Sequence, residues 1–174
     1  MKLNQIITPS PWVERHLREI PNTGEVLDLA CGSGRHTRLL AAHFAAVLAV
    51  DRDASTLAGL AGVPGVRTLC CDLEGEDWPL AGQCFAGVVV TNYLWRPRFT
   101  ELLALLAPGG VLIYETFMLG HAAYGKPSNP DFLLQPGELR ARTAAAGLFE
   151  IDFFEGLTAV PGPALRQAIC VRRA

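Results

Sequence analysis

Short apolar runs alternate with helix-like segments along most of the chain. The apolar runs occupy residues 26–30, 47–50, 66–70, 85–90 and 111–114. The segments between them place apolar side chains on one helical face, as Leu39, Leu40 and Phe44 do after the first run. Continuous apolar runs of this length are typical of strands that helices cover on both faces. The pattern therefore predicts an α/β fold built on an open parallel sheet.

The two ends of the chain carry different signals. Ser10 and Pro11 form a helix start, and apolar positions follow at helical spacing until Pro21, which predicts a leading helix over residues 10–21. Near the other end, residues 149–153 alternate between apolar and acidic side chains, and a further apolar run covers 168–171. The chain between these two strands is too short for a helical crossover, so we expect them to pair antiparallel.

Composition narrows the size and the partners of the protein. The chain has 174 residues, half of them apolar, which predicts a single domain over residues 1–174. The net charge is -2 and no dense run of Lys or Arg occurs, so we expect neither a nucleic-acid partner nor a membrane surface. A small molecule is the expected partner, and the protein is expected to be a monomer or a homodimer.

The cysteines and the N-terminus bear on the compartment. The five cysteines lie in apolar runs without paired metal-ligand spacing, so we expect free thiols in a reducing environment and no bound metal. The N-terminus begins with Met1 to Gln5 and soon reaches Pro9 and Pro11, which leaves no apolar core of signal-peptide length, so we expect no signal peptide. No apolar run is long enough to span a bilayer. We therefore expect a cytoplasmic protein.

The glycine loop at residues 28–34 is the main candidate for a ligand site. It lies between the first predicted strand and its helix, where glycines permit a tight turn and the close approach of a ligand. A dinucleotide-binding loop has a third glycine, but Thr37 occupies that position. A ligand with both an ammonium and a carboxylate group fits better, with Asp28 and strand-end carbonyls receiving the amine. The methionine end of S-adenosylmethionine has this pattern.

Polar side chains follow the next strands of the predicted sheet. Asp51 ends the second strand at an interval from Asp28 close to the roughly 20 residues at which an acid reaches a ribose diol. Asp72 ends the third strand, where it can accept from an adenine amino group with Leu73 packed near the ring. Asn92 and Tyr93 follow the fourth strand, and an aromatic face there can shelter a sulfonium.

Taken in order, these features resemble the class I S-adenosylmethionine-dependent methyltransferases. The likeness rests on residues 26–34, Asp51, Asp72 and the Pro108, Gly109 and Gly110 that precede the fifth strand. It implies a Rossmann-like seven-stranded sheet in the order 3-2-1-4-5-7-6, with the seventh strand antiparallel and helices on both faces. The resulting cofactor-binding residues are Asp28, Ala30, Cys31, Gly32, Gly34, Asp51, Arg52, Asp72, Leu73, Asn92 and Tyr93.

The acceptor side carries a weaker signal. Residues 115–139 look like a bacterial subgroup near the tellurite-resistance-type methyltransferases, and residues 116–136 are expected to form a lid loop over the substrate. The Asn-Pro-Pro-Tyr motif of amino-directed DNA and protein methyltransferases is replaced by residues 92–95, which argues against those acceptors. We expect in-line transfer to a small molecule. Candidate catalytic residues are Tyr93, Glu115, His121 and Tyr124.

Two alternatives use the same sheet. An NAD(P)-dependent oxidoreductase would share an acid near Asp51, but it should also show the third glycine and a pair of residues for hydride chemistry. A protein that binds S-adenosylmethionine without catalysis would need no acceptor site. Binding measurements with both cofactors separate these readings.

Overall fold

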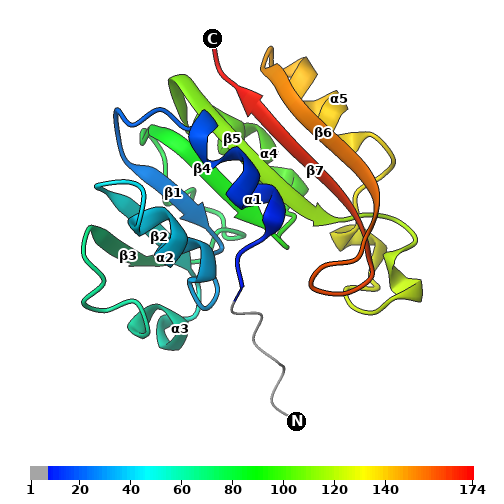
Figure 1. Cartoon of the computed structure of the whole chain (residues 1–174), viewed down its shortest axis with the longest axis horizontal. Helices are drawn as coiled ribbons and strands as arrows, with labels where there is room; N and C mark the ends of the chain where they lie inside the picture. Colours follow the sequence, from blue (N-terminus) through cyan, green and yellow to red (C-terminus); the bar gives the residue numbers. More distant parts are fainter. Residues whose placement is uncertain (1–7) are drawn as a thin grey trace.

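A computed structural model describes residues 8–174, which form a seven-stranded sheet in the order β3-β2-β1-β4-β5-β7-β6 (Figure 1). Neighbours among β1 to β5 pair parallel, and β7 pairs antiparallel with both β5 and β6. The predicted strand order and the reversed seventh strand are confirmed. The strands are β1 (Val26–Leu29), β2 (Val47–Asp51), β3 (Val66–Cys70), β4 (Phe85–Thr91), β5 (Leu106–Phe117), β6 (Phe149–Thr158) and β7 (Ala164–Arg172).

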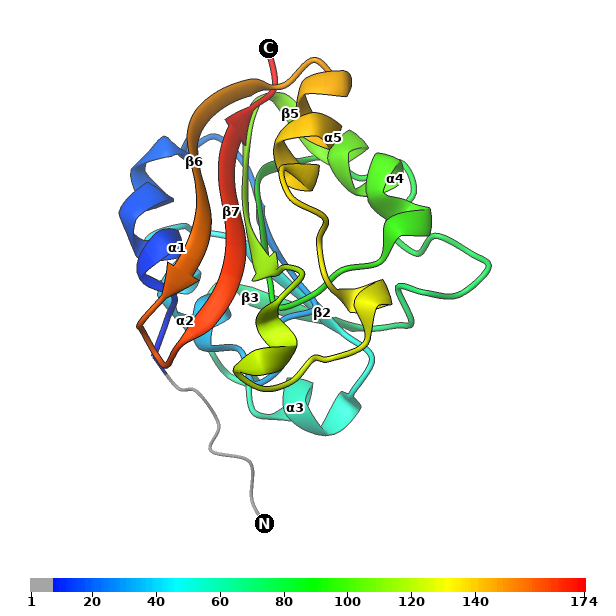
Figure 2. The ribbon, with the colours of Figure 1, turned by 90° about the vertical axis from the view of Figure 1, so that its right-hand side faces the viewer.

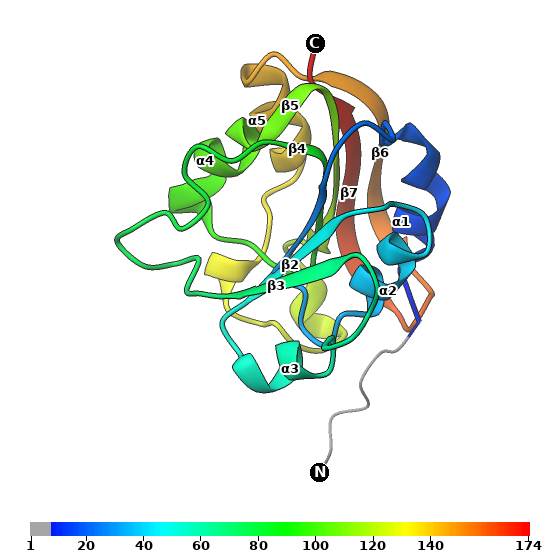
Figure 3. The ribbon, with the colours of Figure 1, turned by 90° about the vertical axis from the view of Figure 1, so that its left-hand side faces the viewer.

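Helices cover both faces of the sheet, as predicted (Figure 2). On one face lie α1 (Pro11–His16) and α2 (Arg35–Ala41), and on the other lie α4 (Phe99–Ala104) and α5 (Glu138–Ala145). The short helix α3 (Ala54–Ala58) packs beside β2 and β3 (Figure 3). Apolar strand residues alternate between the two layers: Leu112 belongs to the core under α4 and α5, and Ile113 to the core under α1.

The leading segment forms one short α-helix that continues as a 3-10 turn. The Ser10 side chain accepts a hydrogen bond from Trp12 N, and Pro11 occupies the first turn, as the sequence signals indicate. The α-helix ends at His16, and residues Leu17–Glu19 form the 3-10 turn. Ile20 then packs on β4, where a Cβ added at Gly87 would lie 2.7 Å from its side chain. The glycine therefore lets this segment sit close to the sheet.

Three features differ from the pattern-based expectation. The helical stripe of Phe99, Leu102, Leu103 and Leu106 predicts a helix that Pro108 terminates. The helix α4 instead ends at Ala104, because Phe85 N donates to Leu105 O and Leu106 already pairs with β4. The strand β3 is half-exposed, since it forms an edge of the sheet and has a neighbour on one side only. The helix α5 was not predicted from the sequence, because its apolar pattern is weak: only Leu139 and Thr143 are buried in it.

A buried carboxyl group joins β1 to α2. Asp28 is 1% exposed, and its Oδ2 accepts a hydrogen bond of 2.6 Å from Thr37 Oγ1. Burial raises the pKa of Asp28 to about 7, and the Thr37 hydrogen bonds oppose that rise only in part. Thr37 occupies the position of the third glycine of a dinucleotide loop, and its hydroxyl group holds the Asp28 carboxyl group inside the fold.

Within residues 8–174, no helix has the length and apolar character needed to cross a membrane. Residues Met1 to Gln5, on which the prediction about a signal peptide rests, lie outside the described residues.

The Asp28→Asn substitution is expected to change how stability depends on pH. Folded Asp28 keeps its proton to about pH 7, whereas the unfolded chain releases it near 3.8, so the group lowers the free energy of unfolding as the pH rises between these values. The amide has no such titration and still accepts from Thr37. In denaturant titrations at pH 4.5, 6 and 8, the free energy of unfolding of Asp28→Asn should therefore rise relative to that of the wild type as the pH increases.

Asp53→Asn serves as the control. Hydrogen bonds from Ser55 lower the pKa of Asp53, so any effect of that variant should run in the opposite direction. A difference between wild type and Asp28→Asn that stays constant with pH would show that Asp28 titrates normally.

Candidate functional site

The loop between β1 and α2 contains three residues in the left-handed backbone region: Ala30, Gly32 and Gly34. Its two glycines serve different purposes. A Cβ added at Gly34 would lie 2.4 Å from Leu60 Cδ2, so Gly34 permits close packing within the protein. A Cβ added at Gly32 would meet nothing within 4 Å. Gly32 therefore presents bare backbone to an open space that a ligand can enter.

Asp51 connects this loop to the end of β2. Its Oδ2 accepts a hydrogen bond of 2.8 Å from Gly32 N, and its Oδ1 accepts one of 3.0 Å from Asp53 N. The carboxylate thus fixes the glycine loop relative to the carboxyl edge of the sheet, which is where open α/β sheets bind ligands.

A cavity of about 180 Å³ opens beside Asp51 at the same edge. It combines carboxylate oxygens with an apolar and aromatic wall, a set of groups that can hold a hydroxylated sugar next to a flat ring. Cys71 and Glu74, which were not predicted to bind the cofactor, contribute to it. Six predicted cofactor-binding residues also line it: Ala30, Asp51, Arg52, Asp72, Leu73 and Tyr93.

Other residues predicted to bind the cofactor lie behind or beside this cavity. Asp28 is buried against Thr37, so its carboxyl group supports the loop from below. Cys31 packs with Leu57 and Leu60, and burial raises the pKa of its thiol to about 12. Gly34 also belongs to this packed side of the loop.

His36, Ser10 and Thr91 form a polar layer under α1, in which His36 makes a hydrogen bond to each of the other two residues. His36 is 2% exposed, and burial lowers its pKa to about 3, so the imidazole is neutral. Its Nε2 accepts from Ser10 N at 2.9 Å, which leaves the proton on Nδ1, 3.2 Å from Thr91 Oγ1. Because its accepting nitrogen is already occupied, His36 ties α1 to α2 and β4 rather than taking up a proton.

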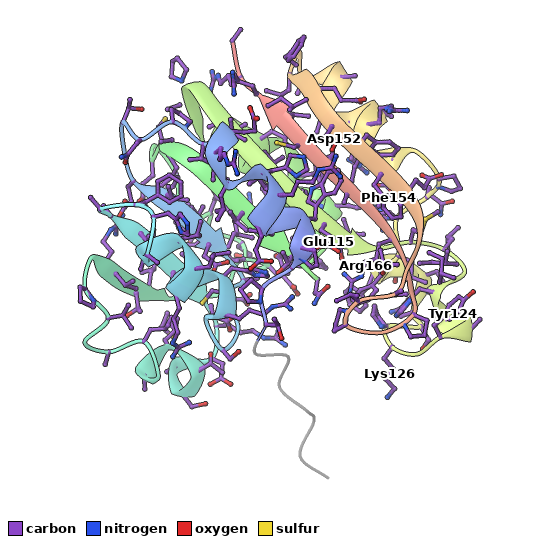
Figure 4. The ribbon with its side chains drawn as sticks, in the orientation of Figure 1. Glu115, Tyr124, Lys126, Asp152, Phe154 and Arg166 are labelled. Atoms are coloured by element: carbon purple, nitrogen blue, oxygen red, sulfur yellow. The ribbon has the colours of Figure 1, made fainter. Side chains whose placement is uncertain are left out.

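Glu115 and Arg166 lie next to this layer, at the ends of β5 and β7 (Figure 4). Ser10 Oγ donates to Glu115 Oε2, and Arg166 Nε lies 3.8 Å from Glu115 Oε1. Arg166 also donates from Nη1 to Asn92 Oδ1 at 2.6 Å and stacks over Phe117 at 4.1 Å. Asn92, predicted to bind the cofactor, is therefore held by a residue that the pattern analysis missed. A charged residue inside the apolar strand β7 was the available signal.

The four candidate catalytic residues do not converge on one point. Tyr93 lines the 180 Å³ cavity, and its carbonyl accepts from the hydroxyl of Tyr114. His121 is 4% exposed, stacks on Phe117 at 4.3 Å, and bonds through Nε2 to Lys126 O at 3.1 Å. Tyr124 is 45% exposed. His121 thus packs inside the loop at 116–136, and Glu115 is the candidate in contact with the network around Asn92.

No group of three or more His, Cys, Asp or Glu residues is arranged to hold a metal ion in the described part of the chain.

Residues 26–110 match the model of a family described as a methyltransferase domain. A search of curated proteins found no match. Among solved structures, TehB from Haemophilus influenzae matches with a TM-score of 0.76 and 17% identity, covering 99% of this chain. The present chain spans 65% of the length of that protein.

Two further structures match over most of both chains. An S-adenosylmethionine-dependent methyltransferase from Mesorhizobium loti has a TM-score of 0.70 and 18% identity, covering 94% of this chain and 96% of its own. The complex of DhpI with SAM and HEP has a TM-score of 0.63 and 22% identity, covering 92% of this chain and 87% of its own. Residues 26–110 thus match a methyltransferase domain, and these structures, which are all under 25% identical, show that the described chain has the fold of S-adenosylmethionine-dependent methyltransferases.

Proposed function

We propose that this chain transfers the methyl group of S-adenosylmethionine in line to a small-molecule acceptor. The observation that carries the proposal is the bare backbone of Gly32 beside the cavity at the ends of β2 and β3. The chemistry of the donor is that of a sulfonium, from which a nucleophile displaces the methyl group.

The cavity residues fit the adenosine part of the donor. Asp51 offers carboxylate oxygens to a ribose diol, Asp72 offers them to an adenine amino group, and Leu73 and Tyr93 provide apolar contact for the ring. Gly32 leaves room for the methionine part, and the carbonyl of Ala30, a residue that lines the cavity, is the proposed acceptor for its ammonium. Asp28 supports this loop from inside the fold.

In-line displacement chiefly requires that the acceptor be held in line with the bond that breaks and that water be kept away. Asn92 ends β4 beside the loop, and Arg166 fixes its side chain. The loop at 116–136, which is anchored by the bridge between Met118 and Leu134, is the proposed lid over the acceptor. The domain is proposed to be a single unit over residues 1–174 and to work as a monomer or a homodimer in the cytoplasm.

The two glycines of the loop give a matched test of the cofactor position. Gly32→Ala should lower the affinity for S-adenosylmethionine at least tenfold, because the methyl group enters the ligand space; the left-handed backbone should cost about 1 to 2 kcal/mol of stability. In Gly34→Ala the added methyl group also collides with Leu60, so this variant should lose about 1 to 3 kcal/mol more stability than Gly32→Ala.

Calorimetry with the cofactor and denaturant titration of each variant measure the two effects separately. If Gly32→Ala binds S-adenosylmethionine like the wild type, the cofactor does not lie over Gly32.

Asp51→Ala tests the ribose contact. It removes the proposed diol acceptor and the partner of Gly32 N, so the affinity for S-adenosylmethionine should fall well over tenfold while the fold is retained. Asp53→Ala is the control, because Asp53 caps α3 and does not line the cavity; it should lose some stability but keep its affinity within about twofold.

The same titrations with NAD examine the oxidoreductase alternative. Binding of NAD without binding of S-adenosylmethionine would refute the proposed function. Binding of S-adenosylmethionine with no methylated product from any acceptor would favour a non-catalytic binding protein.

A further inference from the structure

A second cavity, of about 320 Å³, lies between the start of α1 and the turn that joins β6 to β7. Its walls are mostly apolar and come from distant parts of the chain: Pro11 and Trp12 from α1, Phe154 from β6, and Val160 from the turn. Phe154 points to the same side of the β6–β7 hairpin as Ala168, which also lines the cavity. The space is suited to a compact, largely apolar molecule.

Glu115 is the acidic group that lines this cavity. It is 8% exposed and yet lines the space, so its accessible atoms face the cavity. Its Oε2 accepts from Ser10 Oγ. Within the described residues its Oε1 accepts no hydrogen bond, because Arg166 Nε at 3.8 Å is too far away to donate one. A bound molecule can therefore supply the missing donor.

Two arginines, Arg166 and Arg35, interact electrostatically with the carboxylate of Glu115. Arg166 is 5% exposed, lies against Glu115 and compensates its charge. Arg15 stands at the rim with its side chain 70% exposed and lies 3.5 Å from Asp152. An anionic ligand would meet the carboxylate of Glu115 at close range, and an uncharged donor would not be repelled. The cavity therefore favours an uncharged molecule that carries a hydrogen-bond donor.

Two contact chains connect Glu115 to the proposed cofactor site. Glu115 pairs with Thr91 across β4 and β5, and Arg166 bridges from Glu115 to Asn92 at the end of β4. On the other side, Ser10 bonds both to Glu115 and to His36, which lies in the helix that follows the glycine loop. Through these contacts Glu115 is linked both to the end of β4 and to the helix that follows the glycine loop.

We propose that this cavity is the acceptor subsite, and that it takes a small uncharged apolar molecule whose O–H or N–H group donates to Glu115 Oε1. The inference rests on the proposed function and names its substrate class. In the transfer, the bond from the acceptor oxygen or nitrogen to carbon forms as the S–CH₃ bond breaks. The acceptor proton passes to Glu115 Oε1, and S-adenosylhomocysteine leaves. Glu115 is then the general base of the reaction.

Phenol, aniline, anisole and benzoate form a matched probe set of one ring each. Phenol and aniline are uncharged donors, anisole has no donor, and benzoate is an anion. Binding is followed through the Trp12 indole N–H signal in NMR spectra of the protein saturated with S-adenosylhomocysteine, and transfer through the tritiated methyl group of the cofactor. We expect saturable shifts with phenol and aniline, at least tenfold weaker binding of anisole and benzoate, and labelled product from phenol, aniline or both, which identifies the accepting atom.

Two variants separate the pocket from the base. Val160→Trp should block binding of the probes, and Leu157→Trp, at an exposed position of β6 that does not line the cavity, should not. Glu115→Gln keeps an acceptor for Ser10 but cannot take up a proton, so transfer should fall by about 10² to 10⁴. Its affinity for S-adenosylmethionine should stay within about twofold of the wild type.

The proposal is overturned if no probe shifts the Trp12 signal, if benzoate binds as tightly as phenol, or if phenol and aniline bind without any labelled product. It is also overturned if Glu115→Gln transfers methyl groups at the wild-type rate. Calorimetry with S-adenosylmethionine is run on the same samples. A protein that binds the cofactor but not the probes refutes this subsite alone, whereas a protein that does not bind the cofactor refutes the proposed function.

Discussion

The contact between Glu115 and Ser10 is the point on which the arrangement of the carboxyl edge depends. Glu115 lies near the end of the strand β5, and Ser10 is the N-cap of α1, more than a hundred residues earlier in the chain. Ser10 also caps α1 through its side chain and bonds to His36 through its backbone. A carboxylate that is this deeply buried needs partners, and Ser10 and Arg166 provide them. The leading helix, the glycine-loop helix and the last strand are therefore fixed around one charged group.

The fold was predictable because its main signals are local and repeated. Runs such as 85–90 are apolar throughout, since both faces of β4 are covered, and the acids that end β2 and β3 follow from the same alternation. The sequence pattern failed where long-range pairing decides the outcome. Leu106 continues the helical stripe of α4, but its pairing with Phe85 places it in the sheet. Edge position likewise makes β3 half-exposed despite its apolar residues.

The candidate site divides in the same way. Ala30, Asp51, Arg52, Asp72, Leu73 and Tyr93 follow strands that end at one edge, so their convergence on a cavity could be anticipated from strand order. The inward direction of the Asp28 side chain could not be anticipated, because nothing in the sequence of the glycine loop shows that Thr37 is its hydrogen-bond partner. Arg166 is separated from Asn92 by most of the C-terminal half of the chain, and only the antiparallel return of β7 brings the two together.

The cavity proposed for the cofactor and the second cavity are built from different parts of the chain, so their shapes can change independently. The cavity proposed for the cofactor is built from strand ends and a loop whose backbone is left-handed at Ala30, Gly32 and Gly34. The second cavity is built from the first turn of α1 and a hairpin turn at the edge of the sheet, where Val160 and its neighbours are exposed. Changes in that turn leave the hydrogen bonds of the glycine loop untouched, so the shape of the second cavity can change while donor binding is kept. Glu115 lines the second cavity only, and its backbone pairs with β4. A substitution there therefore acts on the charge of the second cavity without moving the strand that carries it.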